Sequence, residues 1–277
     1  MHVGRIVALA NQKGGVGKTT TAINLACALG LLDWPTLLVD ADPQCNASSG
    51  VGFLPDVNAG NLYRAFIGEA EPKELIVQTA YPNLSLLPSS PDLVGLEVEL
   101  SGTEDRAFRL RRLLDKIRGD YSFMFVDCPP SLGVMTVNAM VAADAVLLPL
   151  QAEYYAMEGL AHLIKTLNLV KHKLNPMLAI DGVIMTMFDV RNTICHTIER
   201  EVRDHFRGKV FMNIIRRSVR LSESPSFGKP IFFYDKSSRG AQDYWELALE
   251  YLMRLGLPVK GQKKTLRERM DEFKGES

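Results

Sequence analysis

Residues 13–20 read Lys-Gly-Gly-Val-Gly-Lys-Thr-Thr, a glycine-rich loop with a lysine at each end. The loop follows an apolar run at residues 6–10 and precedes a segment of helical periodicity that begins near Lys18. Glycines let backbone N–H groups converge on an anion, and the N-terminus of the following helix adds positive potential. A strand, a loop and a helix in this order predict a nucleotide-binding site. Its candidate binding residues are Gly14, Gly15, Val16, Gly17, Lys18, Thr19 and Thr20.

The two lysines of this loop have different expected tasks. Lys18 is placed to reach the β- and γ-phosphates, and Thr19 to hold Mg²⁺ through its hydroxyl. Lys13 is needed for neither task, and a cation in front of the loop is poorly directed at the nucleotide of its own site. We therefore expect Lys13 to reach a nucleotide held by a second copy of the chain.

Short apolar runs alternate with helix-period segments over most of the chain. The runs expected to form strands are residues 6–10, 36–39, 84–87, 123–126, 145–150 and 178–187. The segments expected to form helices are residues 18–31, 105–118, 134–142, 157–172, 193–206 and 240–255. Nearly continuous apolar runs suit parallel strands that are buried on both faces. The pattern predicts a three-layer α/β/α domain over residues 1–257, with a mostly parallel twisted sheet.

Three aspartates follow predicted strands at the edge of the sheet where the loop lies. Asp40 and Asp42 come at the end of one apolar run, and Asp127 ends another. Residues two apart on an extended chain point the same way, so Asp40 and Asp42 approach one region. Carboxylates in that region suit Mg²⁺ and an attacking water, as phosphoryl transfer requires. Each aspartate alone is also consistent with a turn or a helix cap, but three beside one phosphate loop favour a catalytic site.

The composition restricts the class of protein and its setting. The 277 residues are 47% hydrophobic, enough for a sizeable core, and Lys plus Arg equals Asp plus Glu at 32 each. Four scattered cysteines form no C-x-x-C pair, which argues against a zinc site or a disulfide framework. No run approaches the ~18 apolar residues of a membrane-spanning helix. We expect a cytoplasmic protein that is neither secreted nor transmembrane.

The charge balance is uneven along the chain. Between Arg191 and Arg239, eleven Lys or Arg residues stand against five Asp or Glu residues. No helix-turn-helix or zinc-finger pattern accompanies this excess. Contacts to nucleic acid there would be made to phosphate, would weaken with salt and would not depend on sequence. An ordinary set of surface ion pairs is the alternative interpretation of each of these cations.

The tail, residues 258–277, has a different composition from the domain. It is polar, and its only large apolar residues apart from those at its start are Leu266, Met270 and Phe273, at the spacing of one narrow helix face. We expect a solvated or weakly docked helix. A helix that binds a membrane surface would have a wider apolar face, so we expect no stable membrane association.

Four motifs together resemble the ParA/Soj partition ATPases, a branch of the MinD/ParA superfamily of P-loop NTPases with a deviant Walker A loop. They begin at Asn11 (NQKGGVGKTTTAINL), Leu38 (LVDADPQ), Val126 (VDCPPSLG) and Val219 (VRLSESPSFGKP), and the resemblance spans about residues 4–256. It implies an ATPase that uses ATP and Mg²⁺ and forms a homodimer with ATP at the interface. It also implies non-specific binding to double-stranded DNA, stimulation by a ParB-type centromere-binding protein, and association with the nucleoid.

The resemblance assigns roles to individual residues. Lys13 becomes the lysine that reaches the partner's nucleotide, Lys18 the phosphate lysine and Thr19 a Mg²⁺ ligand. Asp42 becomes the residue that orients the attacking water. The supporting metal residues are Asp40 and Asp127. The candidate adenine-side contacts are Arg216 and Ser218. The candidate DNA contacts are Arg191, Arg217, Arg220, Lys229 and Lys236.

The sequence departs from the family pattern at two positions. Cys45 stands where a glycine is expected after Asp-Pro-Gln, which changes the allowed backbone there. Arg216 stands where the family commonly has proline, in a stretch expected near the adenine base. The second departure puts the details of base recognition in question.

Three other classes share some of these features. A MinD-like ATPase acting at a membrane surface would have the doubled lysine and the acids, but a more apolar terminal helix. An electron carrier like the nitrogenase iron protein needs two cysteines placed to bridge a cluster between subunits, and Cys128 beside Asp127 is not so placed. A non-enzymatic DNA scaffold would have no use for the complete set of acids.

Overall fold

The computed structural model describes residues 4–54, 60–153, 156–259 and 265–275, the side chains of the last segment up to residue 271. Seven strands form one sheet in the order β3-β4-β2-β5-β1-β6-β7. The strands are β1 (Arg5–Leu9), β2 (Thr36–Asp40), β3 (Val77–Gln78), β4 (Leu84–Leu87), β5 (Phe123–Asp127), β6 (Ala145–Gln151) and β7 (Ala179–Thr186). All neighbouring pairs are parallel except β3–β4. The predicted mostly parallel sheet is therefore confirmed.

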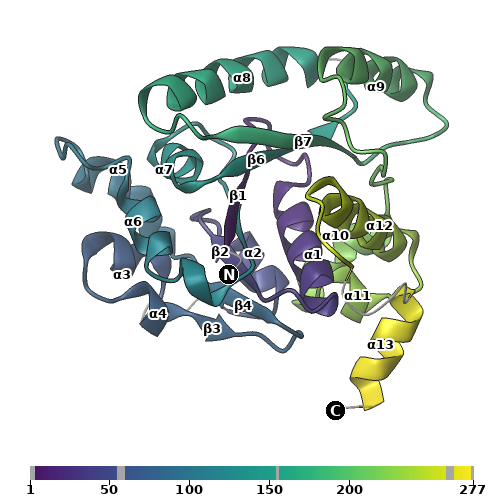
Figure 1. Cartoon of the computed structure of the whole chain (residues 1–277), viewed down its shortest axis with the longest axis horizontal. Helices are drawn as coiled ribbons and strands as arrows, with labels where there is room; N and C mark the ends of the chain where they lie inside the picture. Colours follow the sequence, from purple (N-terminus) through teal and green to yellow (C-terminus); the bar gives the residue numbers. More distant parts are fainter. Residues whose placement is uncertain (1–3, 55–59, 154–155, 260–264, 276–277) are drawn as a thin grey trace.

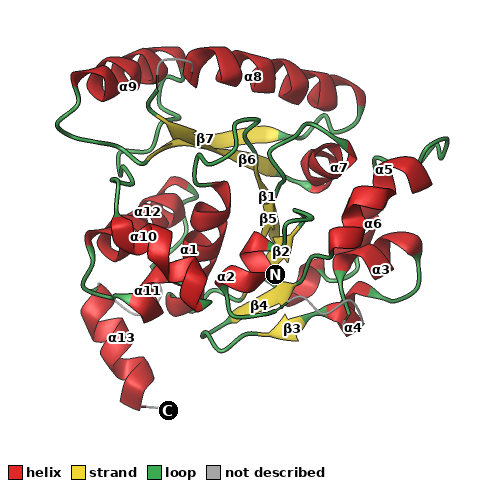
Figure 2. Ribbon diagram, turned by 180° about the vertical axis from the view of Figure 1, so that it is seen from behind, coloured by secondary structure: helices red, strands yellow, loops and turns green. Residues whose placement is uncertain are grey.

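The major helices form a layer on each face of the sheet (Figures 1 and 2). The first layer contains α1 (Lys18–Leu31) and α12 (Arg239–Arg254), which lie side by side with α2 (Asn46–Gly50), α10 (Val219–Glu223) and α11 (Ile231–Tyr234) nearby. The second contains α6 (Arg109–Asp115), α7 (Val134–Ala142), α8 (Ala156–Lys173) and α9 (Thr193–His205). The remaining helices are α3 (Leu62–Ile67), α4 (Pro72–Leu75), α5 (Leu96–Glu99) and the tail helix α13 (Leu266–Gly275).

The core has two halves because the strands bury side chains on both faces. In β1, Ile6 and Ala8 join the core under α6, α7 and α8, whereas Val7 and Leu9 join the core under α1 and α12. All four side chains are fully buried. This is the two-sided burial that a continuous apolar run predicts for a central parallel strand. In the described residues, no helix is long and apolar enough to cross a membrane.

The strand register brings the expected functional residues together. Asp40 at the end of β2 pairs in register with Asp127 at the end of β5, and Asp127 pairs in turn with Leu9 at the end of β1. The glycine-rich loop follows β1 directly. Neighbouring parallel strands lie about 4.8 Å apart, so the loop and the two acids meet at one edge.

Candidate nucleotide site

The glycine-rich loop is anchored from two neighbouring strands. The Thr186 hydroxyl at the end of β7 donates to the Val16 carbonyl at 2.8 Å. Asn11 donates to the Pro149 carbonyl of β6 at 2.7 Å and accepts from the Lys13 backbone N–H at 3.0 Å. Gly17, the residue before α1, has φ +86°, a conformation that favours glycine. These contacts hold the loop open at the N-terminus of α1, where an anion is favoured.

Lys18 lies inside this loop rather than on the surface. Its side chain folds back so that Nζ donates to the Lys13 carbonyl at 3.2 Å, and the residue is only 6% exposed. Burial lowers the pKa of the ammonium, while the nearby Asp127 carboxylate acts in the opposite direction. A buried cation in a glycine-rich loop at the N-terminus of a helix is suited to bind an anion such as a phosphate.

Asp127 is the least satisfied polar group of the site. It is completely buried, and within the described residues no hydrogen bond of normal geometry reaches either carboxylate oxygen. Burial raises its pKa well above the usual range, and the neighbouring Asp40 raises it further. The Thr19 hydroxyl and the Lys18 ammonium lie close enough to oppose this rise. Buried carboxylates are normally paired or bind metal, so Asp127 with Thr19 fits a Mg²⁺ site.

Asp40 has a different environment from the one expected of a metal residue. One oxygen accepts from both the N–H and the hydroxyl of Ser48 at 2.7 Å, and the other accepts from the Asp42 N–H at 3.2 Å. The side chain is fully buried, and burial raises its pKa to about 6. Asp40 therefore fastens the segment that carries Asp42 to α2.

Asp42 lies at the edge of the site with part of its carboxylate available. Its Oδ1 accepts from the Gln44 N–H at 2.9 Å, and its backbone carbonyl accepts from the Ser89 hydroxyl at 2.6 Å. No hydrogen bond to Oδ2 is formed within the described residues. The backbone is thus fixed while one oxygen remains for another ligand, which suits a residue that orients water.

Cys45 adopts the conformation that its position requires. Its φ is +55°, in the left-handed region where glycine is favoured and a side chain is strained. It directly precedes α2, whose Ser48 binds Asp40. The replacement of glycine by cysteine therefore leaves the turn in place with a less favourable backbone.

Lys13 is directed away from the rest of the loop. Its ammonium pairs with Glu153, after β6, and both side chains are about half exposed. Lys13 and Lys18 thus lie only five residues apart but have opposite environments, one exposed and one buried. An exposed cation at this edge is available to another molecule.

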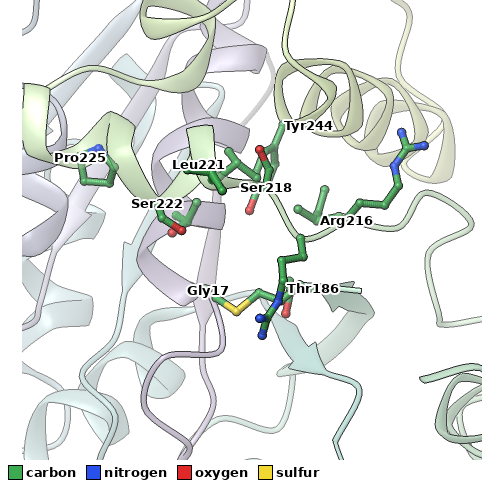
Figure 3. Close-up of a pocket in the computed structure, with 13 residues that line it drawn as sticks. Gly17, Thr186, Arg216, Ser218, Leu221, Ser222, Pro225 and Tyr244 are labelled. Carbon is green, nitrogen blue, oxygen red and sulfur yellow. The ribbon is translucent and has the colours of Figure 1, made fainter. Parts of the chain in front are cut away.

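A cavity of about 490 Å³ continues from the loop toward α10 and α12. Figure 3 shows Gly17 and Thr186 on one side of it and Ser218, Leu221 and Tyr244 on the other. Of the predicted nucleotide-site residues, Gly17, Thr20, Arg216 and Ser218 line it, and so does Arg217, which was predicted as a DNA contact. Its place beside the phosphate loop suits the base and sugar of a nucleotide.

Arg216 is held by an acid of α12. Its backbone N–H donates to the Asp243 carboxylate at 3.0 Å, and its guanidinium forms an ion pair with the same side chain. Asp243 is 2% exposed. The guanidinium is therefore bound to α12, and this contact holds the Arg216 segment in place as part of the cavity wall.

Thr186, Met187 and Tyr244 are among the lining residues that were not identified from the sequence. Thr186 follows the same rule that found the aspartates, because it ends a parallel strand at this edge. Met187 has φ +50° beside it. Tyr244 bonds Thr21 through their hydroxyls at 3.0 Å, an interaction between helices far apart in sequence. Only the position of Thr186 had a signal in the sequence.

The candidate DNA contacts lie on the surface, and most of them are paired. The Arg191 guanidinium donates two hydrogen bonds to Asp189 and its backbone N–H a third, and these bonds lower the pKa of that carboxyl to about 2. Arg220 contacts Glu223 at 3.0 Å and Asp235 at 3.4 Å. Arg217 and Lys229 are exposed and form no ion pair within the described residues. The remaining candidate, Lys236, pairs with Asp271 of α13.

The four cysteines are all buried and free. Cys128 in particular is fully buried, and burial raises the pKa of its thiol. A thiolate that bridges a cluster between subunits must reach the surface. The described residues also contain no group of three His, Cys, Asp or Glu residues that could hold a metal ion. This arrangement does not favour an iron–sulfur protein.

The sheet order, the loop and the acids define a P-loop nucleotide hydrolase of the three-layer α/β/α type. A family model described as an AAA domain matches residues 4–180. A crystal structure titled cobyrinic acid a,c-diamide synthase from Mycobacterium smegmatis, with bound ATP analogue and magnesium, has a TM-score of 0.80 and 34% identity. The superposition covers 92% of this chain and 97% of that one.

Comparison with sequences specifies the family. The chain is 51% identical to the chromosome partitioning protein ParA of Myxococcus xanthus over 252 residues, 91% of this chain and 89% of that protein. It is 46% identical to the sporulation initiation inhibitor protein Soj of Bacillus subtilis over 248 residues, 90% of this chain and 98% of that protein. The chain therefore belongs to the ParA/Soj family of chromosome-partitioning ATPases.

Proposed function

We propose that this protein binds ATP and Mg²⁺, dimerises around the nucleotide, and in that state binds double-stranded DNA without sequence preference. A ParB-type centromere-binding protein would stimulate hydrolysis and release, so that the cycle moves or positions a replicon. The protein would act in the cytoplasm, associated with the nucleoid. Family membership supports the general role, and the arrangement of the site supports the individual steps.

The observation that carries this proposal is the opposite placement of the two loop lysines. Lys18 is buried inside its own loop, where it suits the β- and γ-phosphates. Lys13 is exposed and paired to Glu153 outside the loop. A lysine in that position is better placed to reach a nucleotide in a facing subunit than the one in its own site. ATP would then be a ligand shared by two subunits, and loss of its γ-phosphate would weaken the dimer.

Each residue has a distinct task in the proposed hydrolysis. Thr19 and Asp127 would hold Mg²⁺, which supplies positive charge to the phosphate oxygens when bound. Asp40 would keep Asp42 in place, and Asp42 would orient the attacking water. The partner subunit's Lys13 would stabilise the negative charge that develops on the transferred phosphoryl group, as an arginine finger does.

Mixing two inactive variants tests the assignment across the subunit boundary. A dimer of Lys13→Ala with Asp42→Ala has one site that lacks both groups and one site that has both, provided that Lys13 acts in trans. Mixing the two proteins should restore roughly a quarter of the wild-type ATPase rate if subunits pair at random. If Lys13 acts in its own subunit, each site lacks one group and mixing restores nothing.

The cellular role needs a separate measurement. We expect the ATPase rate to rise most when both DNA and a ParB-type protein from the same locus are present, and less with either one alone. Arbitrary-sequence duplex DNA should be retarded with ATP and not with ADP, and salt should weaken binding steeply. A rate that responds to neither addition would contradict the proposed role in partition.

A MinD-like role at a membrane surface is the alternative function. It shares the doubled lysine and the acids, so the nucleotide site does not separate the two roles. The tail helix favours the DNA-linked role, because Leu266 and Met270 are buried against the protein instead of available to lipid. Sedimentation with liposomes of anionic lipid and ATP distinguishes them. ATP-dependent pelleting would support the membrane role.

A further inference from the structure

The C-terminal tail contacts the domain at two kinds of site. Figures 1 and 2 both place α13 at the periphery, beneath α11 and away from the sheet. Leu266 and Met270, one helical turn apart, are 5% and 3% exposed and join the core that contains Trp34 and Leu252. The tail is thus more firmly docked than its polar composition predicts. Two apolar anchors fix which face of α13 meets the domain.

Ion pairs flank these anchors. Arg269, whose side chain is 14% exposed, pairs with Asp33 at the end of α1. On the other flank, Asp271 pairs with Lys236, which lies between α11 and α12. At the start of the helix, Glu268 accepts from the N–H of Thr265 at 2.7 Å, and the Thr265 hydroxyl oxygen accepts from the N–H of Glu268 at 3.4 Å, the arrangement of a capping box. The docked position of α13 therefore delivers the Asp271 carboxylate to a particular lysine.

That lysine belongs to the candidate DNA surface. Lys236 follows Asp235, and Asp235 contacts Arg220 at 3.4 Å. Arg220 therefore contacts the residue that precedes Lys236, and both cations are expected DNA contacts. Arg220 is neutralised by two acids of the domain, Glu223 and Asp235, whereas Lys236 is neutralised by the tail. The tail thus adds a negative charge to a surface on which DNA phosphate would need positive charge.

We propose that α13 is an autoinhibitory strap: in its docked position Asp271 occupies Lys236, and DNA phosphate competes with Asp271 for that lysine. The inference rests on the DNA-binding part of the proposed function. Release of the strap would add one cation to the DNA surface and remove one carboxylate from it. DNA binding and tail docking would then oppose each other.

The length of α13 suits a reversible contact. An isolated helix of ten residues is marginal in water, so α13 depends on docking to stay helical. Among the described residues, the side chains that dock α13 include Leu266, Arg269, Met270 and Asp271. A segment of this kind opens at a lower free energy than the core helices do.

Substitution of Asp271 is a sharper test than removal of the tail, because the tail carries lysines and arginines as well as acids. Asp271→Asn keeps the size of the side chain and the two apolar anchors. We expect it to tighten ATP-dependent binding to a fluorescent duplex by about 3- to 10-fold at 50 mM salt, and to steepen the salt dependence by about one phosphate contact. Glu104→Gln is the matched control, since it changes the net charge equally at an exposed site in the loop between α5 and α6. Figure 1 shows α5 on the opposite side of the molecule from α11 and α12, between which Lys236 lies.

A second substitution tests whether the effect passes through Lys236. In a Lys236→Met background, Asp271→Asn should change DNA affinity no more than Glu104→Gln does. Hydrogen–deuterium exchange gives a measurement that requires no variant. Amides of residues 266–275 should exchange faster when ATP and DNA are both present than with ATP alone.

The outcomes separate this inference from the function on which it rests. If wild-type protein binds DNA and Asp271→Asn binds equally well or more weakly, the strap is refuted while the proposed function stands. An equal gain from Glu104→Gln, or protection of α13 by DNA, also refutes the strap. If no protein in the series binds DNA with ATP, the proposed function and the strap fail together.

Discussion

Charged side chains have opposite environments in two regions of this protein. One is the nucleotide edge, which contains Lys18 and Asp127, and the other is the basic surface formed by the candidate DNA contacts. At the nucleotide edge, Asp127 and Lys18 are buried, and Asp127 has no hydrogen-bond partner among the described residues. On the basic surface, Arg191 and Arg220 are exposed, and each is paired to an acid of its own segment. A buried charge without a partner is costly, whereas an exposed ion pair contributes little.

This difference indicates how each region would bind its ligand. At the nucleotide edge, the buried Asp127 carboxylate has no hydrogen-bond partner among the described residues. A bound metal ion would supply that partner without displacing an existing one. On the basic surface, Arg191, Arg220 and Lys236 already have acidic partners, so at these cations DNA would exchange one ion pair for another. We therefore expect substitutions at the first region to change activity by large factors and those at the second to change affinity by small ones.

Asp127→Asn should have the largest effect. We expect Mg²⁺-dependent ATP hydrolysis to fall by about 10²- to 10³-fold, because the amide cannot replace a carboxylate beside the metal. Urea unfolding without nucleotide or metal should detect no loss of stability, and a gain of up to about 1–3 kcal/mol, because a carboxyl group whose ionisation is opposed by burial is replaced by a neutral amide.

The two measurements on Asp127→Asn are informative together. Wild-type protein should be stabilised by Mg²⁺ with ATP, and the variant much less so. A variant that is destabilised without ligand would mean that Asp127 has a structural partner. The nucleotide edge would then not contain an unpaired buried carboxylate, and it would no longer differ from the basic surface in this respect.

Asp42→Ala should have the next largest effect, confined to turnover. We expect kcat to fall about 10- to 10²-fold, because the attacking water is no longer oriented. ATP binding and dimerisation should be largely retained, since the only hydrogen bond that the Asp42 side chain accepts among the described residues comes from the Gln44 N–H. Equilibrium binding of a fluorescent ATP analogue and the elution volume with ATP provide the measurements. An unchanged rate would refute the assigned role.

The fold and the nucleotide edge were predictable because their causes are local. Apolar runs determine which residues are buried on both faces of a sheet, and parallel strands bring their ends together. Asp127 could therefore be placed beside the glycine-rich loop without coordinates. The short helices α2 to α5 and the antiparallel strand β3 were not predicted, because each is too short for a periodic pattern.

The pairing of surface charges was not predictable for a different reason. The excess of cations between residues 191 and 239 was visible in the sequence, but each ion pair depends on the conformation of two side chains. Contacts between segments far apart in the sequence could not be predicted either. The bond between Thr21 and Tyr244, and the docking of Met270, depend on how helices pack.

Arg220→Glu should weaken DNA binding by a smaller factor than the losses expected at the nucleotide edge. We expect ATP-dependent affinity for arbitrary duplex DNA to fall about 10-fold at 50 mM salt, because the change reverses the charge beside Glu223 and Asp235. ATP binding should be unchanged, which distinguishes lost DNA contact from misfolding. Normal DNA affinity would remove Arg220 from the proposed interface.

Lys229→Ala should have the smallest effect and compares a free cation with a paired one. Lys229 is exposed and forms no ion pair with the described residues. We expect its loss to weaken DNA binding about 2- to 3-fold and to reduce the salt slope by about 1. Lys171→Ala is the matched control, because Lys171 is an exposed lysine on α8, on the other side of the molecule.

Arg220→Ala is the companion to this variant, because it also removes one positive charge. It should cost more affinity than Lys229→Ala, since it leaves Glu223 and Asp235 unneutralised on the surface that meets DNA. Fluorescence anisotropy over a range of salt concentrations measures both variants on the same duplex. If Lys229→Ala lowers DNA affinity more than Arg220→Ala does, ion pairing within the free protein does not determine how much each cation contributes to DNA binding. Affinity would then follow the position of a cation on the surface alone.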